Sequence, residues 1–265
     1  MSDLYVEVSG RGAPLVLLHG WGLNVRVWDP LGAVLAERFR LITVDLPGHG
    51  RSPWREGCGA LRGQVQCIGD AVAAVIGAVP YALLGWSLGG ELALAWAACP
   101  PPGLATPARL ALIAATPRFT VAADWPYGAP EARLLRLAEG LRRDYRRTVA
   151  EFLELQVRGS AAGEEVLEQL RTALFAHGEA QPEALTAGLE LLRTTDLREA
   201  LGAIAVPTLA IAGQYDRVLL PAASQALAAA MPHARFAEIR RAAHAPFLSH
   251  TAQVADLLAE FLAAP

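Results

Sequence analysis

One serine in the chain is enclosed by glycines in a pattern typical of catalytic nucleophiles. Residues 85–89 read Gly-Trp-Ser-Leu-Gly, which fits G-x-S-x-G with Ser87 at its centre. The pattern needs a strand before it and a helix after it, and the flanking apolar residues predict both. Without that context it would also fit an ordinary tight turn. The helix would point its first amides toward a developing negative charge. We therefore predict that Ser87 is a nucleophile.

A serine hydroxyl is a weak nucleophile that needs a base, and the base needs a carboxylate to orient it. In a strand–turn–helix architecture of this kind, the chain order is serine, acid, histidine. Asp216 follows the apolar run 208–213, and His244 follows the run 234–239. We therefore predict a Ser87–Asp216–His244 triad at the carboxyl ends of strands. A helix-capping aspartate and an ordinary loop histidine are the alternative interpretations.

Acyl transfer also needs hydrogen-bond donors for an oxyanion. The amide of Leu88, next to the nucleophile, is one candidate. The second candidate is the amide of Trp21, in the sequence His-Gly-Trp-Gly that follows the apolar run 15–19. We interpret His19 and His49, which lie in glycine-rich turns, as structural. The other histidines lie in places less suited to a base, namely in the inserted region, before a strand and at the start of the last helix: His177, His233 and His250.

The elements that must position these residues alternate along the chain. Short apolar runs separated by helical patterns predict an α/β fold with a mostly parallel sheet flanked by helices. The runs are 15–19, 41–46, 81–86, 110–115, 208–213 and 234–239. Residues 116–198 contain no convincing strand, and we predict that they form a helical cap inserted over the site. We predict that residues 1–115 and 199–265 form the core. Apolar residues at helical spacing predict a packed C-terminal helix.

Composition narrows the function classes. The chain has 265 residues, of which 53% are hydrophobic and 18% charged, with a net charge of −3. This is typical of a globular protein and gives no basic footprint for nucleic acid or an anionic membrane. Cys58, Cys67 and Cys99 are too few and too scattered for a disulfide framework or a zinc site. The N-terminal residues lack a signal-peptide pattern and no apolar run reaches the length of a membrane span, so we expect a cytoplasmic protein. The predicted triad chemistry needs no metal or cofactor, and we expect a monomer.

The motifs together resemble the α/β-hydrolase superfamily over nearly the whole chain. HGWG, DLPGHGRS, GWSLGG, YD and AAHAPF occur in the order typical of that superfamily. Further segments are similar to the carboxylesterases of the biotin pathway: LLHGWGLNVRVWD, FLELQ, GLELLRTTDLR and AAHAPFLSH. Several of them lie in the predicted cap, outside the catalytic motifs, and therefore discriminate better among superfamily members.

This resemblance implies a substrate and a partner. The substrate would be a pimeloyl chain on the phosphopantetheine of acyl carrier protein, with a methyl ester at its far end. Hydrolysis would release methanol and free the carboxylate. The implied substrate-binding residues are Trp21, Trp86, Leu88, Phe152, Leu153, Glu154, Leu155 and Gln156.

Acyl carrier protein is acidic, so a docking surface should be basic. Arg142, Arg143, Arg146 and Arg147 lie four apart in pairs and would share faces of one helix. A solvated helix face is the alternative interpretation. Glu151 stands where we expect a basic residue from the resemblance, so the docking pattern is shifted or weakened.

Three other functions stay open from the sequence. The first is a generic short-chain carboxylesterase of the same fold without a carrier-protein partner. The second is a carbon–carbon bond hydrolase or a cofactor-free haloperoxidase that uses the same triad. The third is a non-catalytic ligand receptor, which predicts a broken triad or a blocked pocket. Dehalogenases and epoxide hydrolases place aspartate at the nucleophile position, so Ser87 argues against both.

Overall fold

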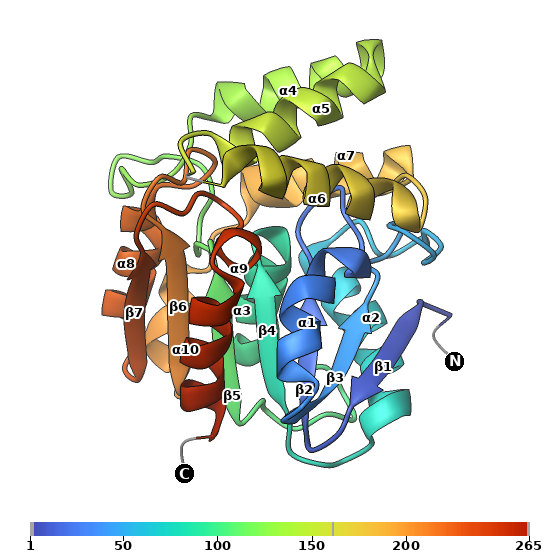
Figure 1. The fold of residues 1–265 in the computed structure, drawn as a ribbon, viewed down its shortest axis with the longest axis vertical. Coiled ribbons are helices and arrows are strands. Elements are labelled where there is room, and N and C mark those ends of the chain that lie inside the picture. Colours follow the sequence, from blue (N-terminus) through green and yellow to red (C-terminus); the bar gives the residue numbers. More distant parts are fainter. Residues whose placement is uncertain (1–2, 161, 264–265) are drawn as a thin grey trace.

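The computed structural model describes residues 3–160 and 162–263. Its centre is a seven-stranded sheet with helices on both faces and further helices above one edge (Figure 1). The strands are β1 Val6–Gly10, β2 Ala13–Leu18, β3 Phe39–Val44, β4 Ala82–Trp86, β5 Arg109–Ile113, β6 Thr208–Gly213 and β7 Ala234–Ile239. All six predicted strands are present, and the predicted α/β fold is confirmed.

The strand order is β1-β3-β2-β4-β5-β6-β7. Only the β1–β3 pairing is antiparallel among these strands, so β2 to β7 end at the same edge of the sheet. The strand at 110–115 ends earlier than predicted, because Ala114 has a φ of 47° and leaves the extended conformation.

The helices account for most of the remaining described chain. The α-helices are α1 Asp29–Leu35, α2 Leu61–Ile76, α3 Leu88–Ala98, α4 Glu131–Arg143, α5 Tyr145–Val157, α6 Gly163–Ala176, α7 Pro182–Thr194, α8 Pro221–Ala230, α9 Pro246–Ser249 and α10 Thr251–Ala263. Two short 3-10 helices are η1 Val25–Trp28 and η2 Arg198–Ala203. The predicted C-terminal helix is confirmed as α10. Among the described residues, no helix combines the length and apolar character needed to cross a membrane.

Alternating residues of the strands pack into two apolar clusters, one on each face of the sheet. Leu15 and Leu17 of β2 pack in the cluster that includes α1 and α10, whereas Val16 and Leu18 pack in the cluster that includes α2, α3 and α8. Successive side chains of a strand point to opposite faces, so a nearly continuous apolar run is what a doubly covered sheet requires. This buried sheet fixes the loops at its carboxyl edge.

Helices α4 to α7 follow one another between β5 and β6 and lie above the carboxyl ends of the strands (Figure 1). Their arrangement agrees with a helical insertion, and the division of the chain at 116 and 198 stays a prediction.

The prediction that four arginines share one helix is wrong. Asp144 has a φ of −153° and a ψ of 91°, which ends α4 at Arg143. Its carboxylate then accepts the amide of Arg147 at 3.1 Å and caps α5. The two arginine pairs therefore lie at the end of one helix and the start of the next, not on shared faces of one helix.

Candidate active site

The turn that carries Ser87 joins β4 to α3. Ser87 itself has a φ of 54°, a conformation that non-glycine residues rarely adopt. There is no room for side chains around it: a Cβ on Gly85 would collide with the Gly89 carbonyl, and one on Gly89 with the Leu18 carbonyl. The glycines of the motif therefore permit the close approach of β2, β4 and α3 that fixes this turn.

The structure brings Ser87, His244 and Asp216 together. His244 Nε2 lies 3.0 Å from Ser87 Oγ, and His244 Nδ1 lies 2.7 Å from Asp216 Oδ2. The other carboxylate oxygen of Asp216 accepts the amides of Val218 and Leu219 at 2.8 and 2.9 Å. The contact between this carboxylate and Nδ1 favours the tautomer with its proton on Nδ1. His244 Nε2 is then free to accept the serine proton.

The three residues differ in exposure. Asp216 and His244 are buried, whereas Ser87 is partly exposed. Trp86 lies beneath the histidine, and its indole nitrogen donates to the His244 carbonyl at 2.9 Å. The His244 amide donates to the Gln156 carbonyl of α5 at 3.0 Å. The histidine is therefore anchored from the sheet and from the helices above it.

The loop after β2 lies beside the nucleophile turn, since the Leu18 and His19 carbonyls approach Gly89. Leu88 is the first residue of α3, whose first amides have no acceptor within the helix. The Trp21 indole donates to the Leu185 carbonyl of α7 at 3.0 Å. Whether the Trp21 and Leu88 amides form an oxyanion hole stays a prediction, but the elements that carry them are adjacent.

Two buried histidines hold the neighbouring loops. His19 Nδ1 contacts the Gly20 carbonyl at 2.8 Å, and its Nε2 accepts the Leu46 amide at 2.9 Å. Burial lowers the pKa of His19, which favours the neutral ring that this pair of contacts requires. Burial, with a smaller effect from His19, lowers the pKa of His49 to about 3. Neither ring contacts Ser87, in keeping with a structural role.

The predicted substrate-binding segment of α5 divides into distinct environments. The Phe152 ring meets the Trp21 ring edge-on at 5.1 Å between centroids. Phe152 and Leu155 line a cavity of about 300 Å³, and the Gln156 side chain is buried. By contrast, Leu153 packs in the core and Glu154 pairs with Arg171 of α6 at 3.7 Å. Only part of the segment therefore faces Trp21.

A groove of about 550 Å³ lies between the α4–α5 junction and α7. Leu185 and Leu189 of α7 line it, and so do Arg142 and Arg146. Helix α7 also reaches the nucleophile region, because a Cβ on Gly188 would lie 2.6 Å from the Trp21 indole and 3.2 Å from the Leu88 side chain.

All four arginines of the predicted docking surface are largely exposed, with 73–84% of each side chain accessible. Each also has an acidic neighbour. Arg142 and Arg143 pair with Glu139, Arg146 with Glu179, and Arg147 with Glu151. Exposed pairs of this kind contribute little to stability.

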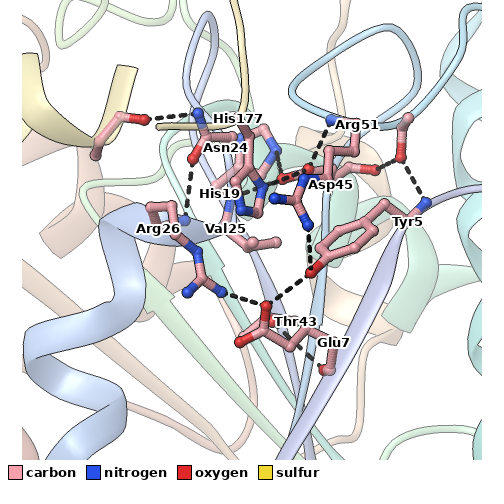
Figure 2. Close-up of polar contacts among 12 residues, drawn as sticks. Tyr5, Glu7, His19, Asn24, Val25, Arg26, Thr43, Asp45, Arg51 and His177 are labelled. Carbon is pink, nitrogen blue, oxygen red and sulfur yellow. Dashed lines mark hydrogen bonds and ion pairs between the residues drawn. The ribbon is translucent and has the colours of Figure 1, made fainter. Parts of the chain in front are cut away.

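Sequence reasoning missed two buried groups near the site. Glu91, on the first turn of α3, is 2% exposed, and its carboxyl oxygens make no hydrogen bond to the residues that the structure describes. Asp45 is fully buried and contacts His177 from the end of α6 (Figure 2). Glu91 carried no signal beyond its place on an otherwise apolar helix, and the Asp45–His177 pair joins residues that are distant in sequence.

Comparisons with known proteins identify the family of the chain. The family model described as the alpha/beta hydrolase family matches residues 15–257. The chain is 45% identical to a protein of Xanthomonas oryzae pv. oryzae named pimeloyl-[acyl-carrier protein] methyl ester esterase, over 98% of this chain and 99% of that protein. A protein of the same name from Stenotrophomonas maltophilia is 44% identical, over 98% and 97%.

Solved structures show the same fold. An esterase from Exiguobacterium antarcticum superposes with a TM-score of 0.88 at 25% identity, covering 98% of this chain and 96% of that one. The strand order, the turn at Ser87 and the full-length matches agree with one another. The chain therefore belongs to the alpha/beta hydrolase family.

Proposed function

We propose that this chain is a serine carboxylesterase that hydrolyses the methyl ester of a pimeloyl chain carried by acyl carrier protein, a step of biotin biosynthesis. The observation that carries the chemistry is the relay from Ser87 Oγ through His244 to the buried Asp216 carboxylate. The substrate assignment rests on the full-length similarity to proteins named for that reaction. That similarity extends through the helices α4 to α7 above the site.

In the first half of the reaction, Ser87 Oγ attacks the ester carbonyl as His244 Nε2 takes its proton. The Asp216 carboxylate holds the imidazole and stabilises its charged form. The amides of Trp21 and Leu88 donate to the oxyanion of the tetrahedral intermediate. Loss of one such donor typically costs about 100–1,000-fold in rate. The intermediate collapses when His244 returns the proton to the methoxy oxygen, methanol leaves, and the acyl group stays on Ser87.

In the second half, a water molecule gives a proton to His244 Nε2 and attacks the acyl-enzyme carbonyl. A second tetrahedral intermediate uses the same two amides. Its collapse returns the proton to Ser87 Oγ and releases the carboxylic acid. His244 therefore accepts and returns one proton in each half of the reaction.

The carrier protein docks on the surface formed by Arg142, Arg143, Arg146 and Arg147. The groove of about 550 Å³ between these residues and α7 supports this placement, because α7 contacts both Trp21 and Leu88. The apolar side chains of the groove suit an acyl chain, while Arg142 and Arg146 at its rim suit the phosphate of phosphopantetheine.

One assay tests the chemistry and the substrate together. Purified protein and its Ser87→Ala variant receive pimeloyl-carrier-protein methyl ester or a short aryl ester, and methanol or the aryl alcohol is measured. We expect the wild-type protein to cleave both esters and the variant to cleave neither. Cleavage of the aryl ester alone would leave a short-chain carboxylesterase without a carrier partner. Undiminished demethylation by Ser87→Ala would refute the nucleophile assignment.

The docking surface is tested by charge reversal. We expect Arg142→Glu with Arg146→Glu to raise KM for the carrier-bound ester about tenfold and to spare the aryl ester. Arg235→Glu is the matched control, because Arg235 is also exposed and paired with an acidic residue, but lies on β7. Equal effects on the two esters, or an equal effect of the control, would refute the docking assignment.

A further inference from the structure

A second histidine–carboxylate contact joins the helices above the site to the core. His177 caps the C-terminus of α6, and its Nδ1 lies 3.2 Å from Asp45 Oδ2 (Figure 2). The His177 side chain is only 6% exposed, and the Asp45 side chain is fully buried. The His177 and Tyr5 rings also meet in a T-shaped arrangement, with 5.2 Å between centroids. This is a well-enclosed polar contact between two parts of the chain 132 residues apart.

The Asp45 carboxylate binds the core on its other sides. Its Oδ1 accepts the Val25 amide at 2.7 Å, and its Oδ2 accepts the Arg51 amide at 2.9 Å. Val25 begins η1, directly after the loop that carries Trp21. The carboxylate therefore bridges the end of α6 and the segment that supplies a proposed oxyanion amide.

Residues 21–25 also form hydrogen bonds directly with α6 and α7. The Asn24 side-chain amide donates to the Ala173 carbonyl of α6 at 2.7 Å. At the other end, the Trp21 indole donates to the Leu185 carbonyl of α7. Residues 21–25 are thus held directly by α6 and α7 through the Asn24 and Trp21 side chains. They are also held indirectly through Asp45, whose contact with His177 joins two ionisable side chains.

We infer that His177 is a positioning residue for residues 21–25, which carry the proposed oxyanion amide of Trp21, and that it acts through Asp45 and the Val25 amide. It touches neither Ser87 nor the reacting ester, and its effect is to hold the loop at the geometry the transition state needs. Small misplacements of such donors are costly, since errors of about 1 Å can reduce rate about 100-fold. The inference rests on the proposed esterase chemistry but not on the carrier-bound substrate.

Other charged groups near His177 belong to the surrounding elements. Glu7 of β1 and Asp29 of α1 are acidic neighbours, while His19 is a buried neighbour on the loop after β2. Arg26 of η1 pairs with Glu7, and the Arg51 guanidinium lies over the Tyr5 ring rather than against Asp45. Among these acidic groups, Asp45 is the one in hydrogen-bond contact with His177.

Three substitutions at position 177 test the inference. In His177→Asn, the side-chain amide nitrogen occupies the position of Nδ1, because both are bonded to Cγ. His177→Gln carries its amide one bond further out, and His177→Leu removes the donor while filling the space. We measure kcat and KM for the short aryl ester and the carrier-bound ester, together with hydrogen exchange of the Val25 amide.

We expect His177→Leu to lower kcat about tenfold for both esters, with KM changed less than about twofold, and to speed exchange at Val25. His177→Asn should restore most of kcat and of the exchange protection, and His177→Gln should restore less. The inference is overturned if folded His177→Leu keeps the wild-type kcat, or if His177→Asn is as impaired as His177→Leu. Because the aryl ester alone suffices as a readout, an error in the carrier-bound substrate would not be mistaken for failure here.

Discussion

Two histidine–carboxylate pairs in this molecule share one local design. In each, a buried aspartate binds histidine Nδ1 through Oδ2 and accepts backbone amides, at Asp216 and at Asp45. The two pairs differ in what the rest of each histidine ring contacts. The Nε2 of His244 reaches Ser87 Oγ at 3.0 Å, whereas His177 lies against the Tyr5 ring. An oriented imidazole therefore becomes a general base only where its second nitrogen meets a reactive group.

The largest expected difference between the pairs comes from matched amide substitutions. Asp216→Asn should lower kcat about 10,000-fold, because the amide no longer favours the required histidine tautomer. Asp45→Asn should lower kcat only about tenfold, together with a loss of about 2–4 kcal/mol in the free energy of unfolding. Steady-state kinetics and urea unfolding of both variants measure this. Similar losses of kcat in the two variants would contradict the claim that only the Asp216–His244 pair takes part in proton transfer.

Glu91 is a third buried carboxyl group and, unlike Asp216 and Asp45, it has no histidine partner among the described residues. Burial raises the pKa of Glu91 well above 4.5. The folded protein then holds a proton that the unfolded chain releases above its ordinary pKa. Stability from this group is present below about pH 4.5 and is lost as pH rises through the raised folded pKa.

We therefore expect Glu91→Gln to increase the free energy of unfolding by about 1–2 kcal/mol at pH 8 and by less near pH 5. The variant should keep its kcat, because Glu91 makes no contact in the Ser87–His244–Asp216 relay. Thermal unfolding across this pH range is the measurement. A stability gain that does not depend on pH would show that Glu91 is not protonated in the folded protein.

His49 provides the reverse case, a buried histidine without a carboxylate bonded to its ring. With a pKa of about 3 in the folded protein and an ordinary value near 6.5 when unfolded, it binds its proton only in the unfolded chain between these values. This favours unfolding increasingly as pH falls from about 6.5 toward 3. His49→Phe should therefore reduce the acid-side slope of stability by up to about 1.4 kcal/mol per pH unit. Unfolding at pH 6, 5 and 4 measures that slope, and an unchanged slope would contradict the prediction.

The sequence allowed the sheet and the relay to be predicted for the same physical reason. Buried parallel strands read as apolar runs, and their carboxyl ends meet at one edge, so Ser87, Asp216 and His244 could be placed together without knowing the structure. The break at Asp144 was predictable in principle, because aspartate is a favoured N-cap residue. We missed it because the arginines on both sides continue a helical pattern.

Other features could not be predicted from local pattern. The Asp45–His177 contact depends on where α6 ends relative to the loop after β3, which is a matter of tertiary packing. The burial of Glu91 likewise depends on what covers α3. Trp86 was predicted to border the substrate, and its observed contacts place it under His244, with its indole on the histidine carbonyl. Its role in binding substrate stays a prediction.

The hydrogen bond from the His244 amide to the Gln156 carbonyl bears on protein engineering. Because the acceptor is a backbone group of α5, no single side-chain exchange reproduces or removes it. A chimaera that grafts the upper helices of another family member onto this core must end its equivalent of α5 with a carbonyl at the same point. A graft chosen only for its substrate pocket would leave the catalytic base without one of its anchors. Transplanting specificity in this scaffold therefore means transplanting part of the support for catalysis as well.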